Sequence, residues 1–280
     1  MIGLQAEQHD LIDAHNFESI NEYVLHLIHT YAYFQSSQIS ENKTVLDLGC
    51  NTGYGTEILS RSAKKITGVD VSEQAILKAK ERYNHPTLEF QQIDGKHLPF
   101  EDNQFDLIVS FQVIEHIVDH YLYINELKRV LSPGGIVIFT TPNAYLRLDP
   151  GMKPWNNFHV REFNHAELEN LLMTYFPVVK VIGLNANEPL YSIEASRLDR
   201  ARQYARNKNS LLKRAFVKAT SILNNPLYLT PAAQKKFISK HGLSDLFYGI
   251  NDLEKALDLL AICTDDGNLL NEAINKIVKP

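Results

Sequence analysis

The chain has 280 residues, of which 44% are hydrophobic and 22% charged, so it can bury a large core and is neither disordered nor collagen-like. Its formal net charge of -5, from 28 basic and 33 acidic residues, argues against nucleic-acid binding by the whole surface. Two cysteines, Cys50 and Cys263, form no zinc-binding spacing and no disulfide framework. No apolar run approaches the roughly 18 residues of a membrane span. We therefore expect a cytoplasmic protein.

Strands and helices alternate through the first two thirds of the chain. Residues 16–34 place apolar side chains at steps of three and four, which predicts an amphipathic helix before the first strand. The pattern that follows predicts an α/β fold with a doubly wound, mostly parallel, Rossmann-like sheet that helices cover on both faces. Strands are expected at residues 44–48, 66–70, 88–92, 105–110, 136–140 and 177–185, and helices at residues 55–62, 73–83, 121–131 and 165–175.

The character of the sequence changes after residue 185. Residues 197–218 carry eight basic residues and one acid, Asp199, in a largely helical stretch. The simplest interpretation is a solvated helical face. The alternative is docking to phosphates of a substrate or weak contact with an anionic membrane surface. Residues 257–263 either extend a short helical turn or form a last strand, and we favour the strand.

The most informative stretch is residues 45–55, VLDLGCNTGYG, in which a strand enters a glycine-rich turn that opens a helix. Glycines let the backbone approach a ligand, and a helix N-terminus presents unpaired N–H groups. Asn51 stands where a dinucleotide fingerprint has its second glycine, which disfavours NAD or FAD. Asp70 ends the next strand, where such folds bind a ribose diol. Asp94 follows the third strand, where an adenine amino group would lie.

These motifs resemble those of the class I S-adenosylmethionine-dependent methyltransferases, in their small-molecule branch. The resemblance spans residues 43–143 and is carried by VLDLGCNTGYGT, GVDVS, the pair Asp94-Gly95, LPFEDNQFDLIVSFQVIEHI and LKRVLSPGGIVIFTTPN. It implies S-adenosylmethionine as the cofactor and S-adenosylhomocysteine as its product. The resemblance assigns Asp47, Gly49, Cys50, Asn51 and Gly53 to the methionine part, Asp70 and Val71 to the ribose, Asp94 and Gly95 to the adenine, and Gln112 to a position beneath the cofactor.

The second half is similar, more loosely, to bacterial methyltransferases of surface-glycan and secondary-product pathways, through HVREF at residues 159–163 and DLEKALDLLAICT at residues 252–264. This resemblance implies a seven-stranded sheet with a helical insertion before its last strand, and the insertion would wall the substrate pocket. The implied parts are an N-terminal helical segment (1–40), a cofactor-binding domain (41–184), a helical cap (185–250) and a last strand with a tail (251–280).

The function that these features imply is methyl transfer to an oxygen, or less readily a nitrogen, of a small-molecule or glycan-linked acceptor. His116 and His159 are the candidates for the general base that removes the acceptor's proton. The alternatives are that Glu115 and His116 only start a helix, and that His159, Arg161 and Glu162 form a surface ion-pair cluster. The visible residues require no metal.

Two other classes of protein share parts of this pattern. A nicotinamide-dependent oxidoreductase would use the same strand, loop and Asp70. A non-catalytic module would bind S-adenosylmethionine without turnover. A nucleic-acid acceptor is disfavoured, because the fourth strand ends in Ser110-Phe111-Gln112 and not in the Asn/Asp-Pro-Pro-aromatic motif of enzymes that methylate amino groups of nucleic acids.

Overall fold

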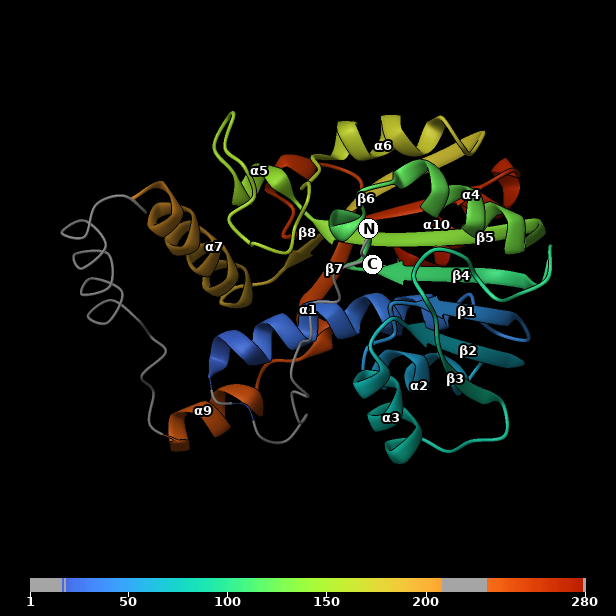
Figure 1. Cartoon of the computed structure of the whole chain (residues 1–280). Coiled ribbons are helices and arrows are strands. Elements are labelled where there is room, and N and C mark those ends of the chain that lie inside the picture. Colours follow the sequence, from blue (N-terminus) through green and yellow to red (C-terminus); the bar gives the residue numbers. More distant parts are fainter. Residues whose placement is uncertain (1–16, 18, 208–230, 279–280) are drawn as a thin grey trace.

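The computed structural model describes residues 17, 19–207 and 231–278, and its centre is a sheet of eight strands in the order β3-β2-β1-β4-β5-β8-β6-β7 (Figure 1). The strands from β3 to β5 pair in parallel, whereas β8, β6 and β7 pair antiparallel to their neighbours. The strands are β1 Thr44–Leu48, β2 Lys65–Asp70, β3 Leu88–Gln92, β4 Phe105–Phe111, β5 Leu131–Pro142, β6 Val178–Ala186, β7 Leu246–Gly249 and β8 Asp258–Thr264.

Helices cover both faces of this sheet, as the alternating pattern predicted. Along each central strand, successive side chains enter opposite cores. Val45 joins the core beneath α1, α2, α7 and α10, and Leu46 joins the core beneath α4 and α6. The helices are α1 Ile20–Ser37, α2 Tyr54–Ser60, α3 Glu73–Arg82, α4 His120–Val130, α5 Ala144–Arg147, α6 His165–Met173, α7 Leu190–Arg206, α9 Pro231–Ile238 and α10 Gly267–Ile277, with 3₁₀ turns η1 Ile114–His116, η2 Leu243–Asp245 and η3 Leu253–Lys255.

The predicted count of seven strands is wrong, because the segment expected to form an all-helical cap also contributes β7. This strand pairs with the edge strand β6, from Gly183 opposite Gly249 to Ala186 opposite Leu246. It is only four residues long and buries Leu246 and Tyr248 while Phe247 is exposed, so its sequence signal is weak. Residues 208–218 of the predicted basic helix lie outside the described residues.

The predicted last strand is confirmed as β8, which lies between β5 and β6 and runs antiparallel to both. Every residue of β8 is buried, which explains its continuous apolar sequence. Two helices were not predicted. α5 forms in the Pro- and Asn-rich loop after β5, and α10 follows β8.

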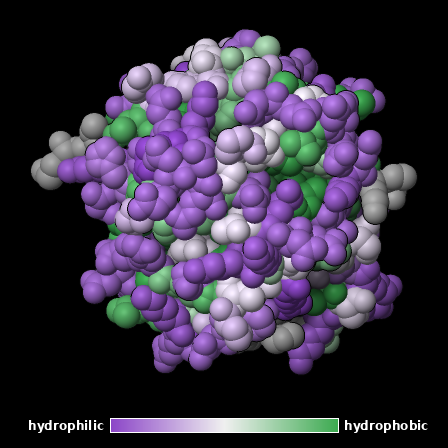
Figure 2. All heavy atoms as spheres, turned by 90° about the vertical axis from the view of Figure 1, so that its right-hand side faces the viewer, coloured by the Kyte–Doolittle hydropathy of each residue, from purple (hydrophilic) through white to green (hydrophobic). Residues whose placement is uncertain are grey.

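The surface at the starts of the parallel strands is mostly hydrophilic, with hydrophobic side chains in small separate groups (Figure 2). None of the described helices has the length and apolar character needed to cross a membrane. The opposite side of the molecule, toward which the arrowhead of β4 points in Figure 1, carries the residues considered below.

Asn143 connects three elements beside this edge. Its Nδ2 donates to the carbonyl oxygens of Leu253 and Ala256, both at 2.8 Å, and its Oδ1 accepts from the Tyr145 N–H at the start of α5. Asn143→Ala would remove a donor from both carbonyl groups, and Leu253 would keep only the Ala256 N–H at 3.3 Å. We expect the free energy of unfolding, measured by urea denaturation, to fall by about 1 to 3 kcal/mol. Asn125→Ala, which removes an exposed hydrogen bond from Asn125 Nδ2 to the Tyr121 carbonyl oxygen, serves as the control, with an expected change within about 0.5 kcal/mol. Equal effects would contradict this role.

Candidate active site

The turn after β1 is held in left-handed backbone conformations by its glycines. Gly49 has φ +83° and Gly53 has φ +82°, while Asn51 between them has φ 47°. The N–H groups of Gly49 and Cys50 both donate to the Val69 carbonyl oxygen, which fastens the turn to β2. A Cβ on Gly49 would lie 2.4 Å from Val113 Cγ2. The glycines are therefore required by backbone conformation and packing, and they hold the turn at the carboxyl edge of the sheet.

Asp70, the last residue of β2, ties this turn to the start of α3. One of its carboxylate oxygens accepts from the Asn51 N–H at 2.9 Å, and the other accepts from the Ser72 N–H at 2.8 Å. Burial raises the pKa of this carboxyl group, although the N–H groups of Ser72 and Asn51 oppose the rise. Each carboxylate oxygen can accept more than one hydrogen bond. Asp70 can thus accept from ligand hydroxyls while it holds the turn.

Asp47 and Cys50 face the interior. Asp47 has no exposed surface, and its carboxylate accepts from Thr56 Oγ1 at 2.7 Å and from the Tyr33 hydroxyl at 3.3 Å. Burial raises its pKa to about 7. Cys50 packs with Ile76 in a small cluster beside α3, and burial raises the pKa of its thiol. These two side chains shape the turn from behind.

A second turn lies at the end of β3. Asp94 Oδ1 accepts from the N–H groups of Lys96 at 2.8 Å and His97 at 3.1 Å, and these bonds lower the pKa of its carboxyl group. Gly95 has φ +74°. Val71 is half-buried, and its carbonyl oxygen accepts from Gln92.

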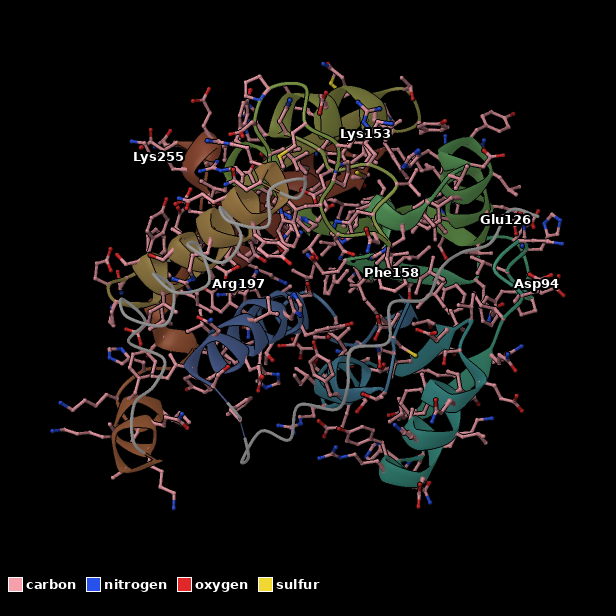
Figure 3. The ribbon with its side chains drawn as sticks, turned by 60° about the vertical axis from the view of Figure 1, so that its left-hand side comes forward. Asp94, Glu126, Lys153, Phe158, Arg197 and Lys255 are labelled. Atoms are coloured by element: carbon pink, nitrogen blue, oxygen red, sulfur yellow. The ribbon has the colours of Figure 1, made fainter. Side chains whose placement is uncertain are left out.

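Gly95 borders a pocket that we call the apolar slot. Glu126 stands on its rim, and Figure 3 shows Glu126 beside Asp94, away from Arg197. A slot with apolar walls and a polar rim is suited to a flat heteroaromatic ring. Its apolar walls are Leu48, Ile93, Leu98, Ile117 and Leu122.

Gln112 follows β4 and has φ 57°, a conformation that is uncommon outside glycine. Its Nε2 donates to Asp258 Oδ2 at 2.8 Å and to Thr140 Oγ1 at 3.2 Å. Asp258 begins β8 opposite Pro142, and burial raises the pKa of its carboxyl group well above the ordinary value. Asp258 was not among the predicted site residues. It lies 146 residues from Gln112 along the chain, so no local sequence pattern links the two.

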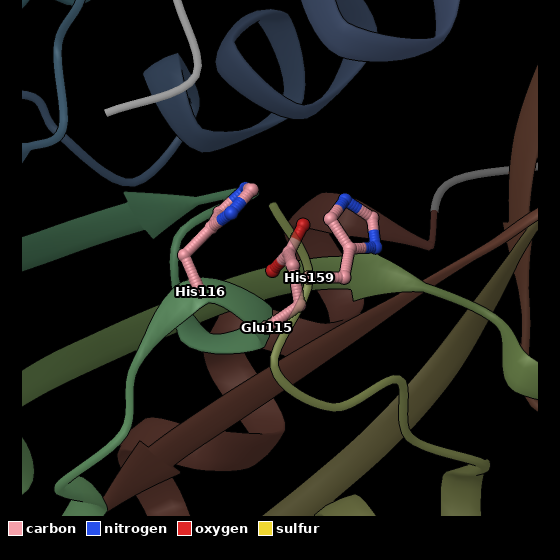
Figure 4. A group of neighbouring side chains, drawn as sticks. All are labelled: Glu115, His116 and His159. Atoms are coloured by element: carbon pink, nitrogen blue, oxygen red, sulfur yellow. The ribbon is translucent and has the colours of Figure 1, made fainter. Parts of the chain in front are cut away.

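Glu115, His116 and His159 lie together beyond the end of β4 (Figure 4). One ligand-type atom from each lies within 4.8 Å of the others, and the two imidazole rings meet edge to face at 4.8 Å between centroids. The N–H groups of Val160 and Arg161 donate to the Glu115 carbonyl oxygen at 2.8 and 3.2 Å, which holds the loop of His159 against η1. Both predicted histidines thus reach one place, and Glu115 joins them.

The alternative interpretation of His159, Arg161 and Glu162 as a surface ion-pair cluster is wrong for two of the three residues, because His159 and Glu162 have almost no exposed side-chain surface. Glu162 is buried and accepts from His159 Nδ1 at 2.7 Å and Arg147 Nε at 2.9 Å. Burial raises the pKa of Glu162, but the bond from His159 and the Arg147 charge outweigh it, so the net shift is downward. Only Arg161 is exposed, where it pairs with Glu167 at 3.4 Å.

A second pocket, which we call the polar pocket, lies between α1, α7 and the carboxyl ends of β4 and β5. Trp155 forms part of its wall, stacks against the Arg147 guanidinium at 4.1 Å and donates to the Arg147 carbonyl oxygen. The pocket is therefore fixed by buried polar contacts. Its polar and charged lining includes His29, Gln112, Glu115, Arg147, Asn156, His159, Glu194, Arg197 and Asp258.

Comparisons with known proteins identify the chain. A family model described as a methyltransferase domain matches residues 46–139. A probable S-adenosylmethionine-dependent methyltransferase from Mycolicibacterium smegmatis is 30% identical over 240 residues, which cover 84% of this chain and 86% of the relative. The chain belongs to the class I S-adenosylmethionine-dependent methyltransferases. A probable methyltransferase from Mycobacterium tuberculosis is 34% identical over 60% of this chain, but only 61% of that relative is matched.

The fold agrees with this assignment. The YcgJ protein from Bacillus subtilis has a TM-score of 0.52 and 17% identity, with 86% of this chain and 100% of that chain covered. Shorter sequence matches include a fatty-acid O-methyltransferase from M. smegmatis, 32% identical over 44% of each chain. They also include a tRNA U34 carboxymethyltransferase from Campylobacter curvus, 34% identical over 42% of this chain and 41% of the relative.

The cofactor of this methyltransferase is S-adenosylmethionine, and the site fits that molecule. The apolar slot suits the adenine, and Asp70 presents acceptors for the ribose hydroxyls. The left-handed turn from Gly49 to Gly53 would adjoin the methionine part, although the N–H groups of Gly49, Cys50, Asn51 and Gly53 already have acceptors within the protein. We therefore propose Asp70 as the side chain that binds the ribose, while Asp47 and Cys50, which face the interior, would act only through the shape of the turn.

Asp70→Ala should weaken S-adenosylhomocysteine binding by about 1.5 to 3 kcal/mol, because buried ribose hydroxyls would lose a charged acceptor. Isothermal titration calorimetry measures the change. Asp106→Ala is a matched control, since Asp106 also accepts a backbone N–H, that of Thr44 at 2.8 Å, but at the start of β1. Unchanged affinity in folded Asp70→Ala protein would contradict the assignment.

Asp47 should make the cofactor-free methyltransferase less stable as the pH rises. Its pKa is raised from 3.8 to about 7, so between these values the folded state holds more protons than the unfolded state. The stabilisation is complete below the lower value and is lost as the pH rises through the higher one. In Asp47→Asn protein the fall in unfolding free energy over this window should be shallower. Urea denaturation across the window tests this, and an unchanged slope would refute it.

Proposed function

We propose that this methyltransferase methylates a hydroxyl oxygen of a small-molecule or glycan-linked acceptor that binds in the polar pocket. The observation that carries the proposal is the lining of this pocket. Glu115, Asp258, His159 and Arg197 offer both acceptors and donors to hydroxyl groups, and Trp155 offers a flat apolar surface. A polyhydroxylated ring presents the same combination of polar edges and apolar faces.

When bound, S-adenosylmethionine would supply a methyl group on a sulfonium. The bond from the methyl carbon to sulfur would break as the acceptor oxygen bonds to that carbon, and the sulfur would leave as a neutral thioether. The protein therefore has to align the acceptor and remove one proton from its hydroxyl group. Alignment falls to the walls of the polar pocket. Removal of the proton falls to the cluster of His116 and His159, whose rings lie 4.8 Å apart.

We further propose that residues 41–184 bind the cofactor and supply one side of the polar pocket, while residues 185–250 cap the acceptor. Two segments outside the cofactor-binding part support this division. α1 contributes Leu25 and Ile28 to the wall of the polar pocket, and α7 contributes Glu194 and Arg197. Residues 1–40 would then belong functionally with the cap.

The described part of the basic stretch favours the solvated, ion-paired interpretation over phosphate docking. Arg197 donates to both oxygens of Glu194 at 2.7 Å, and Arg202 donates to Asp199 at 2.7 Å. Arg206 donates to Asp149. Because these arginines already have acidic partners, a phosphate or membrane surface would have to displace them.

His159→Ala and His116→Ala should each lower turnover by about 100- to 10,000-fold, because either change disrupts the group that accepts the hydroxyl proton. Release of S-adenosylhomocysteine with hydroxylated acceptors measures turnover, and calorimetry should find cofactor affinity nearly unchanged. His85→Ala, an exposed histidine that bonds Thr87, is the control and should keep full turnover. Activity restricted to amine acceptors, or full activity in both mutants, would overturn the proposal.

A further inference from the structure

The cluster of Glu115, His116 and His159 has the composition of a catalytic metal site. Two imidazoles and one carboxylate are a common protein ligand set of zinc and of non-haem iron(II), and such sites keep positions open for substrate. The three ligand-type atoms lie within 4.8 Å of one another. Bonds of about 2.0 to 2.2 Å to one ion would draw them somewhat closer, which side-chain rotation can provide. Figure 4 shows both rings flanking the Glu115 carboxylate.

Each of the two histidines donates a hydrogen bond from Nδ1 to an oxygen atom, as metal-binding histidines usually do. The Phe158 carbonyl oxygen accepts from His116 Nδ1 at 3.0 Å. The Glu162 carboxylate accepts from His159 Nδ1 at 2.7 Å, and Arg147 holds Glu162 in turn. An oxygen that only accepts fixes the proton on Nδ1, so the lone pair of each neutral ring is on Nε2. Metal-bound histidines almost always donate through their other nitrogen in this way.

The burial of the Glu115 carboxylate is only partly compensated by its contacts with the described residues. Only 1% of its surface is exposed, and Thr141 Oγ1 donates to Oε2 at 3.0 Å. Its other oxygen, Oε1, is buried and has no hydrogen-bond partner in the described part of the chain. A buried acceptor without a donor or cation is costly. A metal ion bound to Oε1 would remove this cost.

The charges around the cluster also favour a divalent cation. Within the described residues, four carboxylates surround it, those of Glu115, Glu162, Glu194 and Asp258, and all four residues are buried. Two guanidinium groups, Arg147 and Arg197, oppose them. The carboxyl groups outnumber the guanidinium groups by two, so this region offers more oxygen acceptors than positive charges to a divalent ion.

We propose that Glu115, His116 and His159 bind one divalent transition-metal ion of the zinc or iron(II) type, with open coordination positions toward the polar pocket. Glu115 and His159 both line that pocket, so an acceptor there can reach the ion. A hydroxyl bound to the ion would be more acidic than a free one, so it could release its proton to water in the polar pocket. His116 and His159 would then act as ligands of the ion, in place of their proposed role as the base. This last step, activation of the acceptor, rests on the proposed function.

Metal binding by the full chain tests the site without any acceptor. After removal of metal with a chelator, calorimetry and elemental analysis should find one Zn²⁺ or Fe²⁺ bound per chain, and little binding of Mg²⁺, which prefers oxygen ligands. The thermal midpoint should rise with Zn²⁺. Co²⁺ should give visible absorption bands of a site with nitrogen ligands.

Glu115→Gln and His159→Gln should abolish stoichiometric binding, and Glu162→Gln should weaken it by about 10- to 100-fold, because it removes only the partner of His159. His85→Gln is the matched control and should bind like the wild type. S-adenosylhomocysteine binding shows that each variant is folded. Absence of stoichiometric binding to the wild type, or unchanged binding to both ligand variants, would overturn the inference.

The outcomes separate this inference from the proposed function. Methylation of hydroxyl acceptors by a protein that binds no metal would refute the metal site alone. A metal site lost in Glu115→Gln protein, together with activity only on amines, would refute the proposed acceptor alone.

Discussion

Buried carboxylates at the carboxyl edge of the sheet are the constraint on which the rest of the site depends. Asp47, Asp70, Glu115 and Asp258 all lie at or just beyond this edge and are all buried. A buried carboxylate must be supplied with donors or cations. Hydroxyls serve Asp47, backbone N–H groups serve Asp70, and Gln112 serves Asp258. These requirements fix the turns after β1, β2 and β4 relative to one another.

The two ends of the site are built from different kinds of contact. At the end where we propose that the cofactor binds, the shape of the site is set mainly by the backbone, with Gly49 and Gly53 in left-handed conformations. At the other end, side chains from α1, α7, η1 and the loop before α6 meet in the polar pocket. Backbone geometry tolerates few substitutions, whereas a lining of side chains can change residue by residue. The first end therefore suits a fixed ligand, and the second suits a ligand that varies.

The sequence predicted what depends on neighbouring residues. β1 and β3 have the predicted bounds, and β8 is a strand. β1 and β8 have the apolar sequences of strands that are buried on both faces, whereas β3 is an edge strand that buries only Phe90. The turn and Asp70 were found through local spacing. β7 was missed, since four residues with one exposed aromatic give little periodic signal. α5 was missed because its N-cap, Asn143, lies in a stretch that otherwise has the composition of a loop.

Long-range partners could not be predicted from the sequence, and they decide the chemistry of the site. Gln112 donates a hydrogen bond to Asp258, which lies 146 residues away along the chain, and no local sequence pattern predicts that pair. His159 was predicted, but its setting was not. A glutamate such as Glu162 is expected at the surface. Its hydrogen bonds from Arg147 and His159 offset the cost of burying its charge. A charged residue is read as exposed until its partner is known.

The loop before α6 is held by contacts that are separate from the turn after β1. Residues of the proposed acceptor pocket could therefore differ between relatives while the proposed cofactor site is kept. Peptide N–H groups of Val160 and Arg161 hold this loop on Glu115, and the Trp155 ring stacks on Arg147. None of these contacts involves the turn from Gly49 to Gly53 or the apolar slot. Substitutions in the polar pocket therefore leave the geometry at Asp70 intact.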